Sequence, residues 1–304
     1  MSLGYHELYH IIDPMISPEH PPETITIAAH PQMTEALQIA SKIDDYLNQM
    51  SVKSRHGSLY DEDLRAYVNS GSTDMLIALG GDGTMLRAGH LCAPARVPIL
   101  GINLGGLGFL IEVTRDKWPA AIDRVLAGNF WIETRMMLTA EHFHGESLMG
   151  SWNVLNECVI GRGEMVRPVH LCAEIDNQRI TTYVADGLIV ATPTGSTAYA
   201  LAAGGPILPP ELRNILLVPI APHLSIDRAI VMHEGSEVRI TVRTDHQASL
   251  SIDGHDPVEL QDGDCVRARA SQHEVHFVRL GEADYFYRNI TSRMNENPSA
   301  GDQA

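Results

Sequence analysis

The stretch from Met75 to Ala88, MLIALGGDGTMLRA, joins an apolar run to a glycine-rich turn. The apolar residues Met75 to Ala78 lead directly into Gly80-Gly81-Asp82-Gly83, which predicts a buried strand that ends in a turn without bulky side chains. We expect a helix to begin at Thr84. Because ligands bind where strands end in open α/β sheets, the stretch predicts an α/β fold with a binding site at the end of this strand.

The turn itself suits an anionic ligand. Gly80, Gly81 and Gly83 allow the backbone to approach a ligand closely, so that successive N–H groups can point at phosphate oxygens. Asp82 would repel such a ligand unless it holds a divalent cation or accepts a proton from an attacking hydroxyl. The alternative is an ordinary Asp-Gly turn in which Asp82 caps the helix, and the loop alone does not decide between these roles.

Composition excludes several classes of partner. The chain has 304 residues, with 38 acidic against 22 basic side chains and a formal net charge of -16. Nucleic acids and acidic membranes both require a basic surface, so we expect neither as a partner. The N-terminus lacks the pattern of a signal peptide, and no apolar run approaches the ~20 residues of a membrane span. The four cysteines lie far apart without a CxxC pair, which is typical of a cytoplasmic protein.

Histidine does not predict a metal site. The 15 histidines are scattered along the chain. His142 and His144 share one face of a predicted strand, but no third ligand lies near them in the sequence.

The first half of the chain alternates strands with helices. We expect strands at Thr24–Ala28, Met75–Ala78 and Val97–Ile102, the last ending in a second glycine-rich turn over Asn103–Leu110. Helices are expected where Ala36, Ala40, Ile43 and Leu47 share a face and over Trp118–Ala127, while Ser54–Ser72 is polar with a helical patch at Asp63–Tyr67. This alternation predicts an α/β nucleotide-type domain with a parallel sheet.

The second half changes to short alternating runs separated by turns, which predicts a β-rich, sandwich-like domain. We therefore expect a proline-rich, disordered extension at 1–22, the α/β domain at 23–133 and the β-rich domain at 134–276. A C-terminal segment at 277–294 is expected to pack back on the first domain, and 295–304 to be a disordered tail.

A second candidate site begins at Asp186, in the sequence DGLIVATPTGSTAY. An apolar strand runs into a turn of small residues, where Thr192, Thr194, Ser196 and Thr197 offer hydroxyls and Gly195 leaves space for a sugar, an amide or a phosphate. One alternative is a capped helix, with Ser196 or Thr197 as the cap and Tyr199 packed inward. A serine nucleophile is a further alternative, but the sequence has neither G-x-S-x-G nor an evident histidine base.

Two weaker signals complete the set. Asn156-Glu157 interrupts the apolar strand Val154–Ile160, and a buried glutamate needs a partner, so the pair is a candidate ligand site. Its alternative is the exposed face of an edge strand. Asp253-Gly254 is equally compatible with a plain hairpin turn.

Together these motifs resemble the NAD kinase family. The resemblance rests on Gly80-Gly81-Asp82-Gly83-Thr84, on N-x-G-x-LGFL from Asn103 to Leu110, on Asn156-Glu157, and on Asp186-Gly187 followed by TPTGSTAY and by Ala203-Gly204-Gly205-Pro206. The glycine-aspartate loop alone is shared with diacylglycerol, sphingosine and phosphofructokinase-type enzymes, whereas TPTGSTAY is far more specific. The resemblance spans residues 24 to 290 and implies an enzyme that phosphorylates the 2′-hydroxyl of the adenosine ribose of NAD, giving NADP.

The resemblance also implies roles for single residues. Asp82 would accept the proton, and Gly80, Gly81, Gly83, Thr84, Arg87 and Arg167 would meet the phosphates. Asn156, Glu157 and Asp186 would hold ribose hydroxyls and amide groups, and the rest of the NAD site would be lined by Thr194, Ser196, Thr197, Ala198, Tyr199, Ala202 and His255. The sequence departs from the family at three positions, where many members have a basic residue for Val184, a serine for Ala202 and a glutamine for His255.

The partners implied by the resemblance are NAD and a phosphoryl donor, either ATP with Mg²⁺ or polyphosphate. We expect no protein side chain to bind the metal directly. Family members form homodimers or homotetramers. Two other functions stay open on the residues alone, a lipid kinase of the diacylglycerol type that shares the glycine loop and a non-catalytic dinucleotide sensor.

Overall fold

A computed structural model describes residues 15–16, 20–106, 108–163, 167–223, 226–282, 286–287 and 290. They form two compact units, Met1–Thr134 with His276–Ala304 as unit 1 and Arg135–Val275 as unit 2. The strands β7 (Trp131–His144) and β18 (Cys265–Arg279) each cross the boundary between the units. Most of the extension predicted at 1–22 and the whole tail predicted at 295–304 lie outside the described residues.

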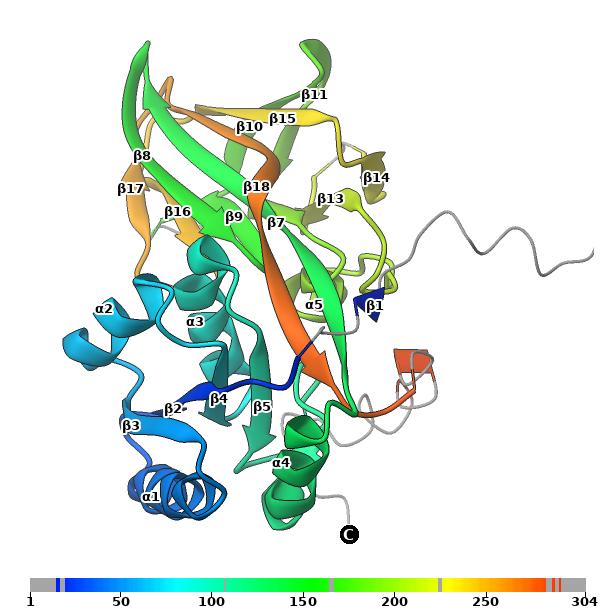
Figure 1. Cartoon of the computed structure of the whole chain (residues 1–304). Coiled ribbons are helices and arrows are strands. Elements are labelled where there is room, and N and C mark those ends of the chain that lie inside the picture. The colour runs from blue at the N-terminus through cyan, green and yellow to red at the C-terminus, as the bar shows by residue number, and fades with distance from the viewer. Residues whose placement is uncertain are drawn as a thin grey trace, which may run out of the picture. The chain divides into compact units, whose positions relative to one another are not determined.

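Unit 1 contains a parallel sheet. Its strand order is β3-β2-β4-β5, formed by β2 (Thr24–Ala29), β3 (Lys53–Ser58), β4 (Met75–Gly80) and β5 (Ile99–Asn103) (Figure 1). The end of β18 continues this sheet, because Phe277 pairs in parallel with Ile99. Short strands β1 (Met15–Ile16) and β6 (Val113–Thr114) pair with β7 and β5, respectively.

Helices cover both faces of this sheet. The buried side chains of α1 (Thr34–Gln49) and α4 (Trp118–Leu126) share one core with Ile25, Ile27, Met75 and Ile77 of the strands. On the opposite face, α3 (Asp82–Cys92) packs so closely on β5 that a Cβ at Gly101 would lie 2.7 Å from the Met85 sulfur. The helix α2 (Glu62–Asn69) packs beside α3. One-turn 3-10 helices occur at Ala93–Ala95 and Arg115–Lys117.

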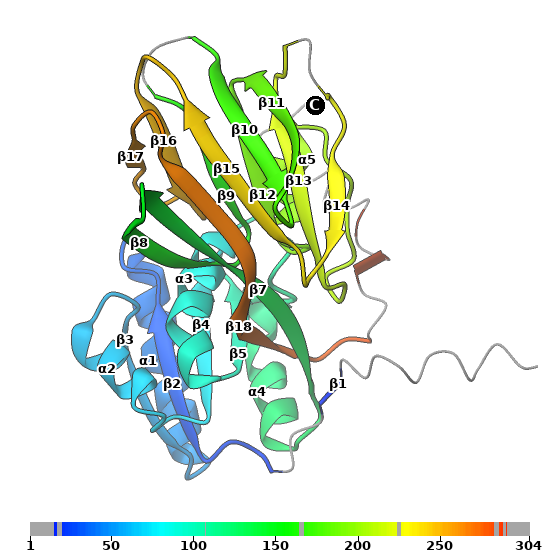
Figure 2. The same cartoon turned by 90° about the horizontal axis from the view of Figure 1, so that it is seen from above.

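Unit 2 is built from antiparallel strands. One group runs β11-β10-β15-β18, and β7 adds to β18 and β8 to β7, with β8 (Ser147–Val154), β10 (Val169–Ile175), β11 (Gln178–Ala185) and β15 (Glu237–Arg243) (Figure 2). The other runs β14-β13-β12-β9-β16-β17, with β9 (Glu157–Arg162), β12 (Gly187–Ala191), β13 (Asn214–Ile220), β14 (Ile230–His233), β16 (Ala248–Ile252) and β17 (Val258–Leu260). Alternate side chains of both groups form one apolar core, which is the arrangement of a β-sandwich. The 3-10 helix Gly195–Thr197 and the four-residue helix α5 (Tyr199–Ala202) follow β12.

The structure confirms the fold class, an α/β unit with a parallel sheet and a β-rich unit. The strand β3 was not predicted, because KSRHGS carries no apolar alternation and the strand pairs at the sheet's edge. The helix α3 begins at Asp82, two residues before the predicted start at Thr84. No described helix is both long and apolar enough to cross a membrane.

Candidate active site

The glycine loop of unit 1 lies at the carboxyl end of the parallel sheet. The strand β4 ends at Gly80, which pairs with Asn103 at the end of β5, so the two glycine-rich turns are neighbours. The N–H of Leu104 donates to the carbonyl of Gly80. Asn103 closes the second turn, since its side chain accepts from the N–H of Gly105 and donates to the carbonyl of Gly106.

Asp82 connects these two turns. Its Oδ2 accepts the N–H of Phe109 at 2.7 Å, and its Oδ1 accepts the N–H of Leu110 at 3.2 Å. A Cβ at Gly108 would lie 2.2 Å from Oδ1 of Asp82, so only glycine permits this approach. The helix-cap interpretation of Asp82 is wrong, because the N-cap is Gly81 and makes no side-chain cap hydrogen bond.

The other loop candidates surround the first turn of α3. Arg87 is half-buried, donates from Nη1 to the Gly83 carbonyl at 3.3 Å and lies over the Tyr60 ring. Thr84 is buried, and its Oγ1 has no hydrogen-bond partner within the described part of the chain. Position 80 must be glycine, because a Cβ at this position would lie 2.1 Å from Oγ1 of Thr84.

In unit 2, the small-residue turn after β12 packs against Asn156. The N–H of Thr192 donates to the Asn156 carbonyl at 2.9 Å, and Oγ1 of Thr192 donates to the Leu155 carbonyl at 2.5 Å. A Cβ at Gly195 would lie 2.1 Å from the Asn156 carbonyl oxygen. Position 195 in TPTGSTAY must therefore be glycine, because any side chain would clash with the backbone of Asn156.

The Asp253 carboxylate contacts the backbone of the segment Leu155–Glu157. Its Oδ2 accepts the N–H of Leu155 at 2.7 Å, and its Oδ1 accepts those of Asn156 and Glu157 at 2.8 and 2.9 Å. The sequence offered Asp253 as a weak candidate signal, equally compatible with a plain hairpin turn. An Asp-Gly pair directly after the strand Ala248–Ile252 does not show that the carboxylate contacts the N–H of Asn156, 97 residues away.

Glu157 is buried in the middle of its sheet. Its strand β9 lies between β12 and β16, so the edge-strand alternative is wrong. Burial raises the pKa of the Glu157 carboxyl to about 8, with a further rise from the charge of Asp253 and an opposing backbone hydrogen bond from Tyr199. Its Oε2 has no partner among the described residues. A neutral carboxyl with a free oxygen is able to donate a hydrogen bond to a ligand.

The hydroxyls of the turn have mostly internal partners. Ser196 is fully buried, donates to the Pro193 carbonyl at 2.6 Å and accepts from the Leu208 N–H at 2.9 Å. Thr197 donates to the Thr194 carbonyl, and Thr194 accepts from Arg135 at 3.1 Å. Neither Ser196 nor Thr197 caps a helix, and Tyr199 is 45% exposed, so the capped-helix alternative with an inward Tyr199 is wrong.

The remaining candidates lie at or near the surface of unit 2. Asp186 forms an ion pair with Nε of Arg162 at 3.3 Å. Ala198 and Val184 are half-buried, whereas Ala202, His255 and Arg167 are exposed. Arg162 and Arg135 were missed by the sequence analysis, because neither belongs to a recognisable motif.

His142 and His144 do find a common partner. Their ring nitrogens lie 2.8 and 2.7 Å from the two oxygens of Asp264. Within the part of the chain that the structure describes, no group of three or more His, Cys, Asp or Glu side chains could hold a metal ion. The structure thus shows this histidine pair as a link between the β7–β8 hairpin and the turn before β18.

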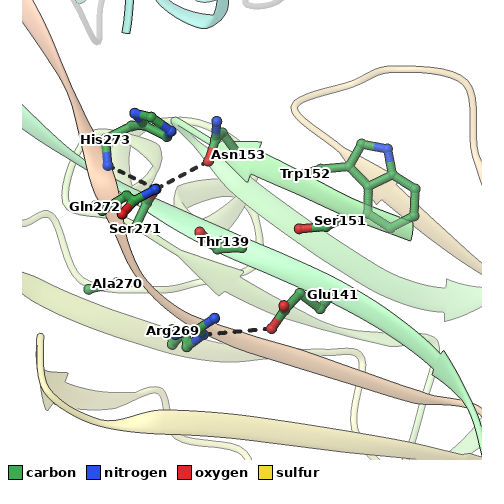
Figure 3. Close-up of a pocket in the computed structure, with 10 residues that line it drawn as sticks. All are labelled: Thr139, Glu141, Ser151, Trp152, Asn153, Arg269, Ala270, Ser271, Gln272 and His273. Atoms are coloured by element: carbon green, nitrogen blue, oxygen red, sulfur yellow. Dashed lines mark hydrogen bonds and ion pairs between the residues drawn. The ribbon is translucent and has the colours of Figure 1, made fainter. Parts of the chain in front are cut away.

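A polar pocket of about 640 Å³ opens on strands β7, β8 and β18 (Figure 3). In its lining, Nε of Arg269 forms an ion pair with Oε2 of Glu141 at 3.6 Å. The Ser271 hydroxyl donates to Asn153 and accepts from the His273 N–H. None of the candidate site residues lines this pocket.

Comparisons with known proteins cover nearly the whole chain. Residues 20–130 match the model of the ATP-NAD kinase N-terminal domain, and residues 155–280 match that of the ATP-NAD kinase C-terminal domain. The chain is 36% identical to an NAD kinase of Dehalococcoides mccartyi over 274 residues, covering 90% of this chain and 96% of the relative. It is also 36% identical to an NAD kinase of Chloroflexus aurantiacus over 275 residues, covering 90% and 99%.

Two solved structures have the same fold. Yeast NADH kinase complexed with NADH superposes with a TM-score of 0.76 at 24% identity, covering 95% of both chains. An NAD kinase from Archaeoglobus fulgidus in complex with ATP gives a TM-score of 0.72 at 22% identity, covering 90% of this chain and 99% of the other. Since family models match both halves and curated relatives exceed a third identity over nine-tenths of its length, this chain belongs to the NAD kinase family.

Proposed function

We propose that this chain phosphorylates the 2′-hydroxyl of the adenosine ribose of NAD, giving NADP, with ATP or polyphosphate as the phosphoryl donor. Its family makes it a phosphotransferase with an alcohol group as acceptor. The observation that carries the proposal is the match to curated NAD kinases across 90% of the chain. The geometry of both candidate sites is compatible with it.

In this proposal Asp82 orients the acceptor hydroxyl and takes its proton. Each Asp82 oxygen accepts one backbone N–H, and a carboxylate oxygen has a second lone pair, so capacity for the hydroxyl remains. As the ribose oxygen bonds to phosphorus, the O–H proton passes to Asp82 and the bond from phosphorus to the donor's bridging oxygen breaks. Backbone N–H groups of the glycine loop and Arg87 meet the phosphates.

Mg²⁺ enters this proposal with ATP. Asp82 is the carboxylate of the glycine loop, and each of its oxygens accepts a backbone N–H, which fits a proton acceptor rather than a direct ligand of the metal. When bound, Mg²⁺ neutralises charge on the transferred phosphoryl group.

Unit 2 supplies the residues proposed to hold NAD. Asn156 and Glu157 are fixed by Asp253, and the turn Thr192–Thr197 is fixed against Asn156. The unpartnered Oε2 of Glu157 supports a ligand contact, because a buried polar atom without a partner costs free energy until a ligand supplies one. Tyr199 and Ala202 are exposed and free to contact adenine or ribose.

The direct test is Asp82→Asn. The amide keeps the size of the side chain but is a far weaker proton acceptor, so we expect turnover to fall by about 10²- to 10⁴-fold while NAD still binds. ADP release measures turnover, and calorimetry measures NAD binding. Asp63→Asn is the matched control, because Asp63 is an exposed aspartate in the first turn of another helix of unit 1. Near-normal turnover of the Asp82→Asn enzyme would remove Asp82 from this role.

The choice of acceptor separates this proposal from its rivals. We expect ADP release with NAD and none with diacylglycerol, since a membrane substrate favours a basic surface and the chain carries 38 acidic against 22 basic side chains. NADH and polyphosphate are tested in the same assay as alternative acceptor and donor. Release with diacylglycerol alone would indicate a lipid kinase, and NAD binding without any ADP release would indicate a sensor.

We also propose that the protein is cytoplasmic and forms a homodimer or homotetramer. The oligomeric state rests on the resemblance to the family, and the location is supported by the four cysteines, which are all free. Size-exclusion chromatography with light scattering measures the oligomeric state.

A further inference from the structure

A buried arginine at the end of β18 contacts the loop that holds Asp82. Arg279 is 2% exposed and donates from Nη1 to the carbonyl of Leu110 at 2.8 Å. Its Nε and Nη2 both lie 2.6 Å from Oε2 of Glu133, which is 4% exposed. This ion pair allows the guanidinium to remain inside unit 1, because a buried charge without a partner is strongly disfavoured.

Leu110 joins this ion pair to Asp82. It is 4% exposed, accepts from Arg279 through its carbonyl, and donates through its N–H to Oδ1 of Asp82 at 3.2 Å. The preceding N–H, of Phe109, donates to Oδ2 of Asp82 at 2.7 Å. A shift of the Leu110 carbonyl therefore displaces the donors that set the direction of the Asp82 carboxylate.

The loop is fixed at both ends by different groups. Asn103 closes its beginning through Gly105 and Gly106, and Arg279 holds its end. A second link joins the same two chain segments, because Oε1 of Glu112 accepts the N–H groups of Leu280 and Gly281. Loss of Arg279 would thus leave the segments attached while freeing the Leu110 carbonyl.

We propose that Arg279 is a positioning residue for phosphoryl transfer, which holds Leu110 so that the Phe109 and Leu110 amides aim the Asp82 carboxylate at the acceptor hydroxyl. This inference rests on the proposed role of Asp82 as proton acceptor. An arginine suits the task, since its planar group contacts a carboxylate and a carbonyl at the same time in fixed directions.

The first experiment compares Arg279→Met with the double variant Glu133→Gln/Arg279→Met in the full chain. Small displacements of a reacting group cost up to about 10²-fold in rate. In Arg279→Met we therefore expect kcat to fall by about 10- to 100-fold and the KM for NAD to change by less than about threefold. Arg124→Met is the matched control, because Arg124 is exposed and donates to the carbonyl of Leu280, the residue after Arg279.

The double variant separates positioning from stability. It also neutralises the buried Glu133 carboxylate, which loses its ion pair with Arg279 in Arg279→Met, so we expect its melting temperature to return toward that of the wild type while kcat stays low. Recovery of kcat together with the melting temperature would overturn the proposal. So would an equal loss of kcat in Arg124→Met.

The second experiment repeats Arg279→Met in the Asp82→Asn background. If Arg279 acts through Asp82, its loss should change the residual kcat there by less than about twofold, because residues that act as a unit are not additive. The same fold-loss in both backgrounds would overturn the positioning role. Near-normal turnover of Asp82→Asn alone would instead overturn the proposed function, so the two failures are distinguishable.

Discussion

Glu157 is a carboxyl group that the fold buries near a second carboxylate. Its pKa is raised from the ordinary 4.5 to about 8, chiefly by burial and then by Asp253. Between these two values the folded chain holds a proton that the unfolded chain has released. This group therefore stabilises the fold less and less as the pH rises from 4.5 toward 8.

Glu157→Gln should remove this dependence. Glutamine cannot ionise and keeps an oxygen for the N–H of Tyr199, so the variant gains stability relative to the wild type by up to about 1.4 kcal/mol for each pH unit in that window. Urea unfolding between about pH 5 and about pH 8 measures the difference. Glu146→Gln, at an exposed carboxylate of the β7–β8 turn, is the control and should leave the slope unchanged. Equal slopes for wild type and Glu157→Gln would contradict the prediction.

At the scale of elements, the candidate NAD site depends on a turn that supports a strand. The turn after β16 places Asp253 at a φ of 47°, with Gly254 at 71°, and turns the Asp253 carboxylate toward three N–H groups at the start of β9. These are the N–H groups of Leu155, Asn156 and Glu157. The turn thereby determines where the polar pair of β9 lies.

Asp253→Asn should loosen this arrangement. Asparagine tolerates the positive φ but has one acceptor oxygen and no charge, so we expect the free energy of unfolding to fall by about 1–3 kcal/mol. The KM for NAD should rise by about 10-fold, the equivalent of about 1.4 kcal/mol. Chemical unfolding and steady-state kinetics measure the two effects. Asp256→Asn, an exposed carboxylate of the same turn, should change neither, and an unchanged KM in Asp253→Asn would exclude a role for this turn in NAD binding.

Local patterns predicted most elements but not all their partners. Helix spacing identified α1 and its buried Ala36, Ala40, Ile43 and Leu47, and apolar runs identified β4 and β12. The strand β3 was missed because its residues lack apolar alternation. The entry of β18 into the parallel sheet was also beyond local pattern, since pairing of Phe277 with Ile99 depends on sheet order.

At the scale of the whole molecule, the two units differ in how the chain builds them. Unit 2 is one continuous segment, whereas unit 1 needs residues from both ends of the sequence. Phe277, Val278 and Arg279 are all buried in unit 1. They supply a strand of its sheet and the partner of the buried Glu133.

A fragment of residues 20–134 should therefore not fold cooperatively, whereas a fragment of residues 135–275 should. Removing a buried phenylalanine costs about 3–5 kcal/mol, and leaving Glu133 without Arg279 costs a similar amount. Their sum reaches a typical total stability of about 5–15 kcal/mol. Thermal unfolding followed by circular dichroism distinguishes the fragments. A sharp transition for residues 20–134 alone would contradict the prediction.

The sequence by itself determined the fold class, the family and the motifs of the site, because short-range periodicity and glycine spacing are written in neighbouring residues. Only the tertiary structure decided what those motifs contact. In the structure the Asp82 carboxylate accepts the N–H groups of Phe109 and Leu110, and the Asp253 carboxylate accepts those of Asn156 and Glu157. Arg279 donates to the carbonyl of Leu110, 169 residues away. Contacts of that range follow from strand order and register, which local sequence does not encode.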